Sequence, residues 1–102
     1  MVPKMKPVHP GQILKEGYLK PLNISIASAA RTLGISRQSL SDFINGKTDL
    51  SPEMAKRLSL ATNADVEYWM RIQNKLDIWK ATYCTKQYKI QPFELRTSTS
   101  AH

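Results

Sequence analysis

Cysteine and long apolar runs are nearly absent from this sequence, and acidic residues are scarce. Cys84 is the only cysteine, so no internal disulfide can form, and without a CxxC pair we expect no metal site and no cofactor. No stretch approaches the roughly 20 apolar residues of a membrane-spanning helix, so we expect no membrane contact. Residues 1–8 include basic side chains but no apolar run follows them, so we expect a cytoplasmic protein without a signal peptide.

Residue types that carry out acid–base or nucleophilic catalysis are also few. The two histidines are His9, next to a predicted helix start, and His102, the last residue. Neither of them forms a catalytic cluster with Cys84 in the sequence. We therefore predict that the protein is not an enzyme and that His9 packs against or caps a helix. Small basic chains include RNases, and an RNase activity abolished by His9→Ala would support that alternative.

Positive charge, in contrast, is abundant. Fifteen Lys and Arg face eight Asp and Glu, which gives a net charge of +7 and a pI of about 9.8. A balance of this size favours a polyanionic partner such as nucleic acid. Solubility alone is the plainer explanation, and charge by itself does not decide between the two.

The segment 26–47 is the most informative stretch, because it predicts two short helices joined by a tight turn. Ala30 is small enough for the two helices to approach closely. Gly34 tolerates the positive φ that the turn needs, and Ser36 suits the N-cap of the second helix. This pattern is typical of a helix-turn-helix. A helical hairpin with no role in nucleic-acid binding is the alternative.

The second of these helices is expected over residues 37–44, with Asn45-Gly46 ending it. Leu40 and Phe43 fall on one face and would pack inward, whereas polar side chains occupy the other face. The predicted DNA-contacting residues are Ser25, Ser28, Ser36, Arg37, Gln38, Ser39, Ser41, Asp42, Asn45 and Lys47.

These polar residues have distinct expected roles. Arg37 and Gln38 would lie in the first turn of the second helix, the part that enters a major groove most deeply. Gln38 suits a bidentate pair with adenine, and Arg37 suits guanine or a phosphate. Asp42 would accept from a cytosine amino group or orient Arg37 or Gln38. Ser36, Ser39 and Ser41 would give short hydrogen bonds to phosphates or bases. Ser25 and Ser28, at the start of the preceding helix, would offer backbone amides to a phosphate, and Asn45 and Lys47 would bind the next phosphates.

Two further helices flank this pair in the predicted core. A first helix is expected over residues 10–20, interrupted by Gly17 and ended by Pro21, with Leu22 and Ile24 following as core contacts. A fourth helix is expected to start at Ser51-Pro52-Glu53 and to end at Asn63. Its predicted core-facing residues are Met54, Ala55, Leu58 and Ala61.

A fifth helix is expected over residues 66–83, capped by Asp65. Its apolar residues Trp69, Ile72, Leu76, Trp79 and Tyr83 repeat at heptad spacing. The N-terminal half would close the domain core. Leu76, Trp79 and Tyr83 would project beyond the domain and form a dimerisation ridge. The alternative is that Trp79 folds back onto the first helix.

Together these elements predict an all-α fold, a five-helix lambda-repressor-like helix-turn-helix domain over residues 9–84 whose last helix mediates dimerisation. Residues 1–8 would form an extended, mobile arm. Residues 85–102 would form an extended or partly disordered tail, because Pro92 blocks a central strand and the last residues are polar. The tail's apolar residues would pack on their own domain or on a partner.

Three stretches resemble the HigA/VapI antitoxin family of Xre-type helix-turn-helix proteins. Residues 8–14, VHPGQIL, are similar to the family's HPGEIL start, and residues 30–45 are similar to its helix-turn-helix. Residues 67–79, EYWMRIQNKLDIW, are similar to the family's EFWLNLQNxxDLW signature. The last match is the most specific, because both tryptophans, the Gln-Asn pair and the aspartate recur at the same spacings.

The resemblance implies a homodimer that binds a palindromic double-stranded operator at its own promoter. It also implies a second partner, a small basic RelE- or HigB-like toxin that cleaves messenger RNA on the ribosome and that the antitoxin neutralises. Some relatives lack an obvious toxin, so a solitary Xre-type repressor is an alternative. A protein-interaction module that keeps the fold without binding DNA is another.

Overall fold

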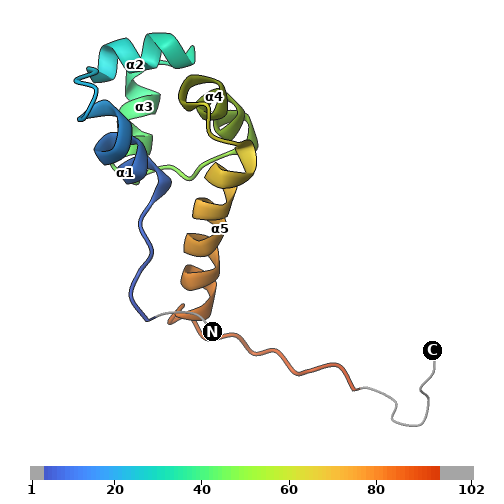
Figure 1. Cartoon of the computed structure of the whole chain (residues 1–102). Helices are drawn as coiled ribbons and strands as arrows, with labels where there is room; N and C mark the ends of the chain where they lie inside the picture. Colours follow the sequence, from blue (N-terminus) through green and yellow to red (C-terminus); the bar gives the residue numbers. More distant parts are fainter. Residues whose placement is uncertain (1–3, 95–102) are drawn as a thin grey trace, which may run out of the picture.

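The computed structural model describes residues 4–94, and its regular elements are all helical. In chain order they are α1 (Pro10–Leu14), the π-helical segment η1 (Lys15–Leu19), α2 (Ile26–Leu33), α3 (Arg37–Ile44), α4 (Pro52–Thr62) and α5 (Val66–Thr82). Because η1 continues α1 directly, the two form the first of five helices, and the predicted all-α class is confirmed. Figure 1 shows α1 to α4 clustered at one end, with α5 extending away from them beside the N-terminal arm. None of the helices described within residues 4–94 has the length and apolar character needed to span a membrane.

The first helix differs from the single α-helix expected over residues 10–20. After Leu14 the chain widens into a π-helix, in which the Lys20 N–H donates to the Lys15 carbonyl five residues back at 3.0 Å. Leu14 and Leu19 are both buried. In an α-helix, residues five apart point in different directions, whereas i to i+5 pairing brings both side chains onto the core-facing side.

Gly11 sets how closely the first helix approaches α3. A Cβ built at Gly11 would lie 2.0 Å from the Phe43 carbonyl oxygen and 2.9 Å from the Ile44 Cα, both of which are backbone atoms. No side chain can occupy that space unless one helix moves. The glycine of the VHPGQIL stretch therefore permits backbone-to-backbone packing against the end of α3.

The turn between α2 and α3 has the predicted geometry. Gly34 has φ 73° and ψ 30°, the left-handed conformation, and the Ile35 N–H donates to the Ala30 carbonyl at 3.0 Å. Ser25 and Ser36 cap α2 and α3 as expected. Ala30 is buried, which agrees with its predicted place between closely packed helices.

The core lies among the first four helices and is closed by the start of α5. Leu40, Leu58 and Trp69 are completely buried in it. Three expected core residues are at the surface instead: Leu22 is 64% exposed, and Ile24 and Ala61 are also exposed. The first helix ends before Leu22 in a turn over residues 20–23, so Leu22 lies in an exposed turn and does not make the predicted core contact.

The C-terminal half of α5 corrects one part of the predicted dimerisation ridge. Leu76 is only 1% exposed within a single chain, so the expectation that it projects from the domain is wrong. Its side chain lines the same hollow as Pro7 and Val8 of the N-terminal arm. Trp79 is half-buried, and its indole N–H donates to the Lys4 carbonyl at 2.9 Å. Trp79 therefore contacts the arm, and the interpretation that it folds back onto the first helix is not what the structure shows.

The arm and the described part of the tail are both extended. Residues 85–94 contain no helix or strand, and every one of them is exposed, so this segment does not pack on its own domain. Its apolar side chains Tyr88, Ile90 and Phe93 face solvent. The polar end of the tail, residues 96–102, lies outside the described residues.

Replacing Gly11 by alanine should destabilise the fold strongly, because the new methyl group would overlap the backbone of α3. We expect the free energy of unfolding to fall by at least about 3 kcal/mol. Gly17→Ala is the matched control, since a Cβ at Gly17 meets nothing within 4 Å. It should stabilise the protein by about 0.5–1 kcal/mol. Urea denaturation of both variants measures the difference, and equal stabilities would contradict the close contact.

Candidate nucleic-acid interface

One face of α3 is buried and the opposite face presents hydrogen-bonding side chains to solvent. Leu40, Phe43 and Ile44 pack into the core. Arg37, Gln38 and Ser39 in the first turn are exposed, as predicted, while Ser41 and Asp42 are half-buried. Within residues 4–94 no ion pair or hydrogen bond engages the Arg37 guanidinium. The division between the two faces follows the periodicity of the sequence.

Gln38 is held in position by Asp42, one turn further along α3. Its amide Nε2 donates to the Asp42 Oδ1 at 2.9 Å. The predicted orienting contact of Asp42 is therefore present, toward Gln38 rather than Arg37. The second Nε2 hydrogen and the Oε1 of Gln38 are left as a donor and acceptor pair, which is the set that an adenine edge requires.

The N-terminus of α2 and the C-terminal end of α3 border one surface hollow. It has a volume of about 400 Å³, and Ser25, Asn45, Lys15 and Lys20 are among its lining residues. The Ser25 hydroxyl accepts from the Ser28 N–H at 3.1 Å, so the amides of the first turn of α2 before Ser28 stay available to an anion. The prediction included Ser25, Ser28 and Asn45 but missed the two lysines, because they belong to the first helix.

Helix α3 ends at the Asn45-Gly46 pair. Of these two residues, Gly46 takes a positive φ, at 75°, and Asn45 does not. The Lys47 N–H donates to the Asp42 carbonyl at 2.8 Å. The Asn45 amide donates to the Ser41 hydroxyl at 3.4 Å, which is a long contact. The Lys47 side chain is exposed just beyond the helix.

At the N-terminal end of α3, the Ser36 hydroxyl accepts from the Ser39 N–H at 3.0 Å and lies 2.9 Å from the Ser39 hydroxyl.

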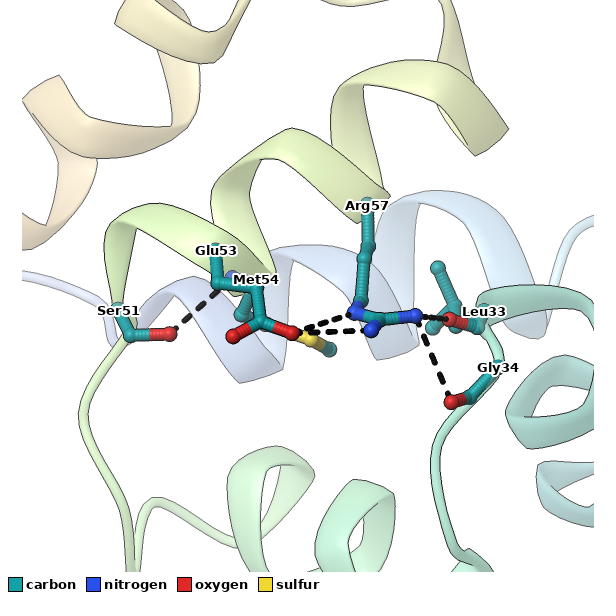
Figure 2. Close-up of polar contacts among 6 residues, drawn as sticks. All are labelled: Leu33, Gly34, Ser51, Glu53, Met54 and Arg57. Atoms are coloured by element: carbon teal, nitrogen blue, oxygen red, sulfur yellow. Dashed lines mark hydrogen bonds and ion pairs between the residues drawn. The ribbon is translucent and has the colours of Figure 1, made fainter.

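Arg57 on α4 fixes the turn of the helix-turn-helix and was not predicted. Its Nη1 donates to the Leu33 carbonyl at 2.8 Å, and a longer contact of 3.4 Å reaches the Gly34 carbonyl. Figure 2 shows its other nitrogens directed at Glu53, with the Nη2 to Oε2 distance 2.9 Å. Arg57 thus satisfies carbonyls that the end of α2 leaves without a helical partner. The i, i+4 spacing of Glu53 and Arg57 was visible in the sequence, but the carbonyls they serve were not.

Comparison with known proteins identifies the family. A helix-turn-helix family model matches residues 16–69. Virulence-associated protein A′ of Dichelobacter nodosus is 45% identical over 71% of this chain and 63% of its own length. Antitoxin HigA-1 of Vibrio cholerae is 34% identical over 74% of this chain and 71% of its own length. The chain belongs to the HigA/VapI family of Xre-type helix-turn-helix proteins.

The fold of this chain agrees with the family assignment. Antitoxin HigA of Pseudomonas aeruginosa, solved with the higBA promoter, matches with a TM-score of 0.74 and 28% identity over 87% of this chain and 100% of that one. The chain spans just under two thirds of the length of the Dichelobacter relative. Family membership therefore rests on the helix-turn-helix domain that the chains share.

The family's C-terminal signature has a structural explanation in this chain. The glutamine of this signature is Gln73, which is the buried polar residue within residues 4–94. The Gln73 Oε1 accepts from the Leu50 N–H at 2.8 Å. The Gln73 Nε2 donates to the Asp77 Oδ1 at 2.9 Å. Gln73 was missed as a positioning residue because its partner is a backbone amide 23 residues earlier, which spacing does not reveal. The aspartate of the signature orients the glutamine.

The histidine of the family's HPG start is a structural residue, as the sequence predicted. The His9 Nδ1 accepts from the Gly11 N–H at 2.8 Å and so caps α1, while the Nε2 donates to the Thr48 carbonyl at 2.9 Å. Its ring also meets Phe43 edge-on at 5.4 Å. Burial lowers the pKa of His9, against an opposing effect of the Thr48 carbonyl. Within residues 4–94, His, Cys, Asp and Glu side chains form no group of three that could hold a metal.

Stability should decline in acid because of His9. A lowered folded-state pKa means that the unfolded chain binds a proton first, so the stabilisation is complete above pH 6.5 and is lost as the pH falls through the folded-state pKa. His9→Asn keeps a side chain that can cap a helix but does not titrate. Urea unfolding between pH 5 and 8 should show a steeper loss in the unmodified chain than in this variant. Identical pH dependence in both would refute the role of His9.

Proposed function

We propose that this protein binds double-stranded operator DNA at its own promoter as a homodimer and represses transcription. The observation that carries the proposal is the solvent-facing side of α3. It presents Arg37 and Gln38, and the Gln38 side chain is held in place by its hydrogen bond to Asp42. A family member with the same fold was solved with promoter DNA. The net charge of +7 suits such a partner.

In this proposal α3 lies in the major groove with its first turn deepest. Gln38 reads an adenine with the donor and acceptor that Asp42 leaves available, and Arg37 pairs with a guanine or a phosphate. The capped N-terminus of α2 binds a phosphate through its first amides, assisted by Ser25 and Ser28. The remaining polar contacts to phosphates or bases come from Ser36, Ser39, Ser41, Asn45 and Lys47.

Two copies are needed because one recognition helix makes few base contacts. A two-fold dimer would place two α3 helices about 34 Å apart, one turn of DNA. Of the predicted ridge, Trp79 and Tyr83 remain suitable for a dimer surface. Their rings lie 5.4 Å apart, and Tyr83 is 39% exposed at the end of a helix that extends beyond the rest of the domain (Figure 1). Leu76 cannot contribute to this dimer surface, because it is buried within a single chain.

The second part of the proposal is that the chain neutralises a small basic RelE- or HigB-like toxin, as its relationship to HigA antitoxins suggests. The alternative, a solitary Xre-type repressor, is favoured by relatives named simply as transcriptional regulators. Purification of the tagged chain from its native locus separates the two. A small basic protein at fixed stoichiometry, which stops growth when expressed alone, would establish an antitoxin. A homodimer that shifts its own promoter fragment and co-purifies with no second protein would instead support the solitary repressor.

Gln38→Ala should reduce operator affinity selectively. Losing a bidentate base contact costs about 1–3 kcal/mol at one base pair, while binding to random DNA of the same length is unchanged. Lys47→Ala is the matched comparison, because removing a phosphate contact weakens operator and random DNA alike and lowers the salt slope by about one. Fluorescence anisotropy over a salt series measures both. Equal losses of Gln38→Ala on the two DNAs would rule out base reading by this residue.

Trp79→Ala should weaken dimerisation and operator binding together. Truncating a buried interface tryptophan typically costs about 2 kcal/mol or more, roughly a 30-fold rise in the dimer dissociation constant. Ile78→Ala is the control, because Ile78 is an exposed neighbour on the same helix outside the predicted ridge. Sedimentation equilibrium measures the dissociation constants. An unchanged dimer in Trp79→Ala would contradict the proposed interface.

A further inference from the structure

The segment between α3 and α4 is anchored by three successive residues. Thr48 accepts the 2.9 Å hydrogen bond from His9, and the Asp49 carboxylate lies 3.7 Å from the Lys80 ammonium. Leu50 donates its N–H to the buried Gln73 amide at 2.8 Å. Successive residues of an ordinary surface loop are seldom each tied to another element.

Two of the three residues that hold this segment are on α5, and the third, His9, is connected to α5 through the N-terminal arm. Gln73 and Lys80 lie on α5 itself. His9 continues into the N-terminal arm, whose Lys4 carbonyl accepts from the Trp79 indole of α5. The segment that joins the recognition helix to α4 is therefore attached to the helix that carries the proposed dimer surface.

The anchors differ in strength, and Gln73 is the strongest. It is 2% exposed, and deleting its acceptor oxygen would leave the buried Leu50 N–H without a hydrogen-bond partner, which is strongly unfavourable. The Asp49 and Lys80 side chains are 63% and 46% exposed, so that pair contributes little by itself.

We propose that Gln73, supported by Asp77 and Lys80, is a positioning residue for operator recognition: it locks the orientation of α3 to α5, so that the dimer accepts one spacing between operator half-sites. The proposal rests on the proposed dimeric, operator-binding function. Gln73 touches no DNA in it and acts through the segment that ends α3. A dimer with rigidly held recognition helices discriminates between spacings, because each base pair added or removed rotates one half-site by about 34° and moves it by about 3.4 Å.

The test uses the promoter fragment of the protein's own gene and synthetic duplexes with the half-sites moved one or two base pairs closer together or further apart. The unmodified chain should lose affinity about tenfold or more when the spacing changes. Gln73→Met keeps the buried volume but removes the hydrogen bonds, and it should bind all spacings within about threefold of one another. General destabilisation would lower affinity for every spacing alike and leave the preference intact.

Asn74→Ala is the matched control on the adjacent, exposed residue of α5, and it should keep the preference. If Gln73→Met does not fold, the double variant Asp77→Ala/Lys80→Ala removes only exposed side chains, the one that orients Gln73 and the one that pairs with Asp49. It should narrow the spacing preference without abolishing it, because the bond from the Leu50 N–H to Gln73 remains. A folded variant with undiminished spacing preference would overturn this inference and leave the proposed function standing. Failure of the unmodified chain to prefer its promoter over random DNA would overturn both.

Discussion

The close approach of the first helix to the end of α3 is the constraint on which the rest of the structure depends. At Gly11 two backbones meet without an intervening side chain. His9 caps α1 and contacts both Phe43 and Thr48, so the same short segment seats the inner face of α3 and anchors the chain just beyond that helix. A recognition helix held in this way keeps its outer face in one orientation, and pre-organised side chains lose less entropy when they bind.

Long polar side chains complete what the short helices cannot supply themselves. An eight-residue helix leaves a large share of its backbone groups unpaired at its ends. Arg57 reaches from α4 to the carbonyls that end α2, and Gln73 reaches from α5 to the Leu50 amide. In each case a carboxylate one turn away, Glu53 or Asp77, holds the side chain in place. Gln38 and Asp42 repeat the same i, i+4 arrangement on the outer face of α3.

Local signals in the sequence predicted the helix-turn-helix well. Serine caps, left-handed glycines and 3.6-residue periodicity are properties of neighbouring residues, and they gave the bounds of α3, the Gly34 turn and the buried side of the helix pair. Features that depend on distant residues were not predictable. The burial of Leu76 beside the N-terminal arm follows from how separate segments meet. The π-helical widening after Leu14 and the turn that exposes Leu22 are local, but no capping or periodicity signal in the sequence marked them. Gln73 and Arg57 were missed for the same reason, since their partners are backbone atoms more than 20 residues away.

Hydroxyl-radical footprinting of the gene's own promoter fragment tests the central claim most directly, namely that two α3 helices read one face of the DNA. The account predicts two short protected patches, centred about 10 base pairs apart on the same face of the duplex, at protein concentrations that leave random DNA unprotected. Protection that is uniform along the fragment, or that requires the same concentration as on random DNA, would contradict it.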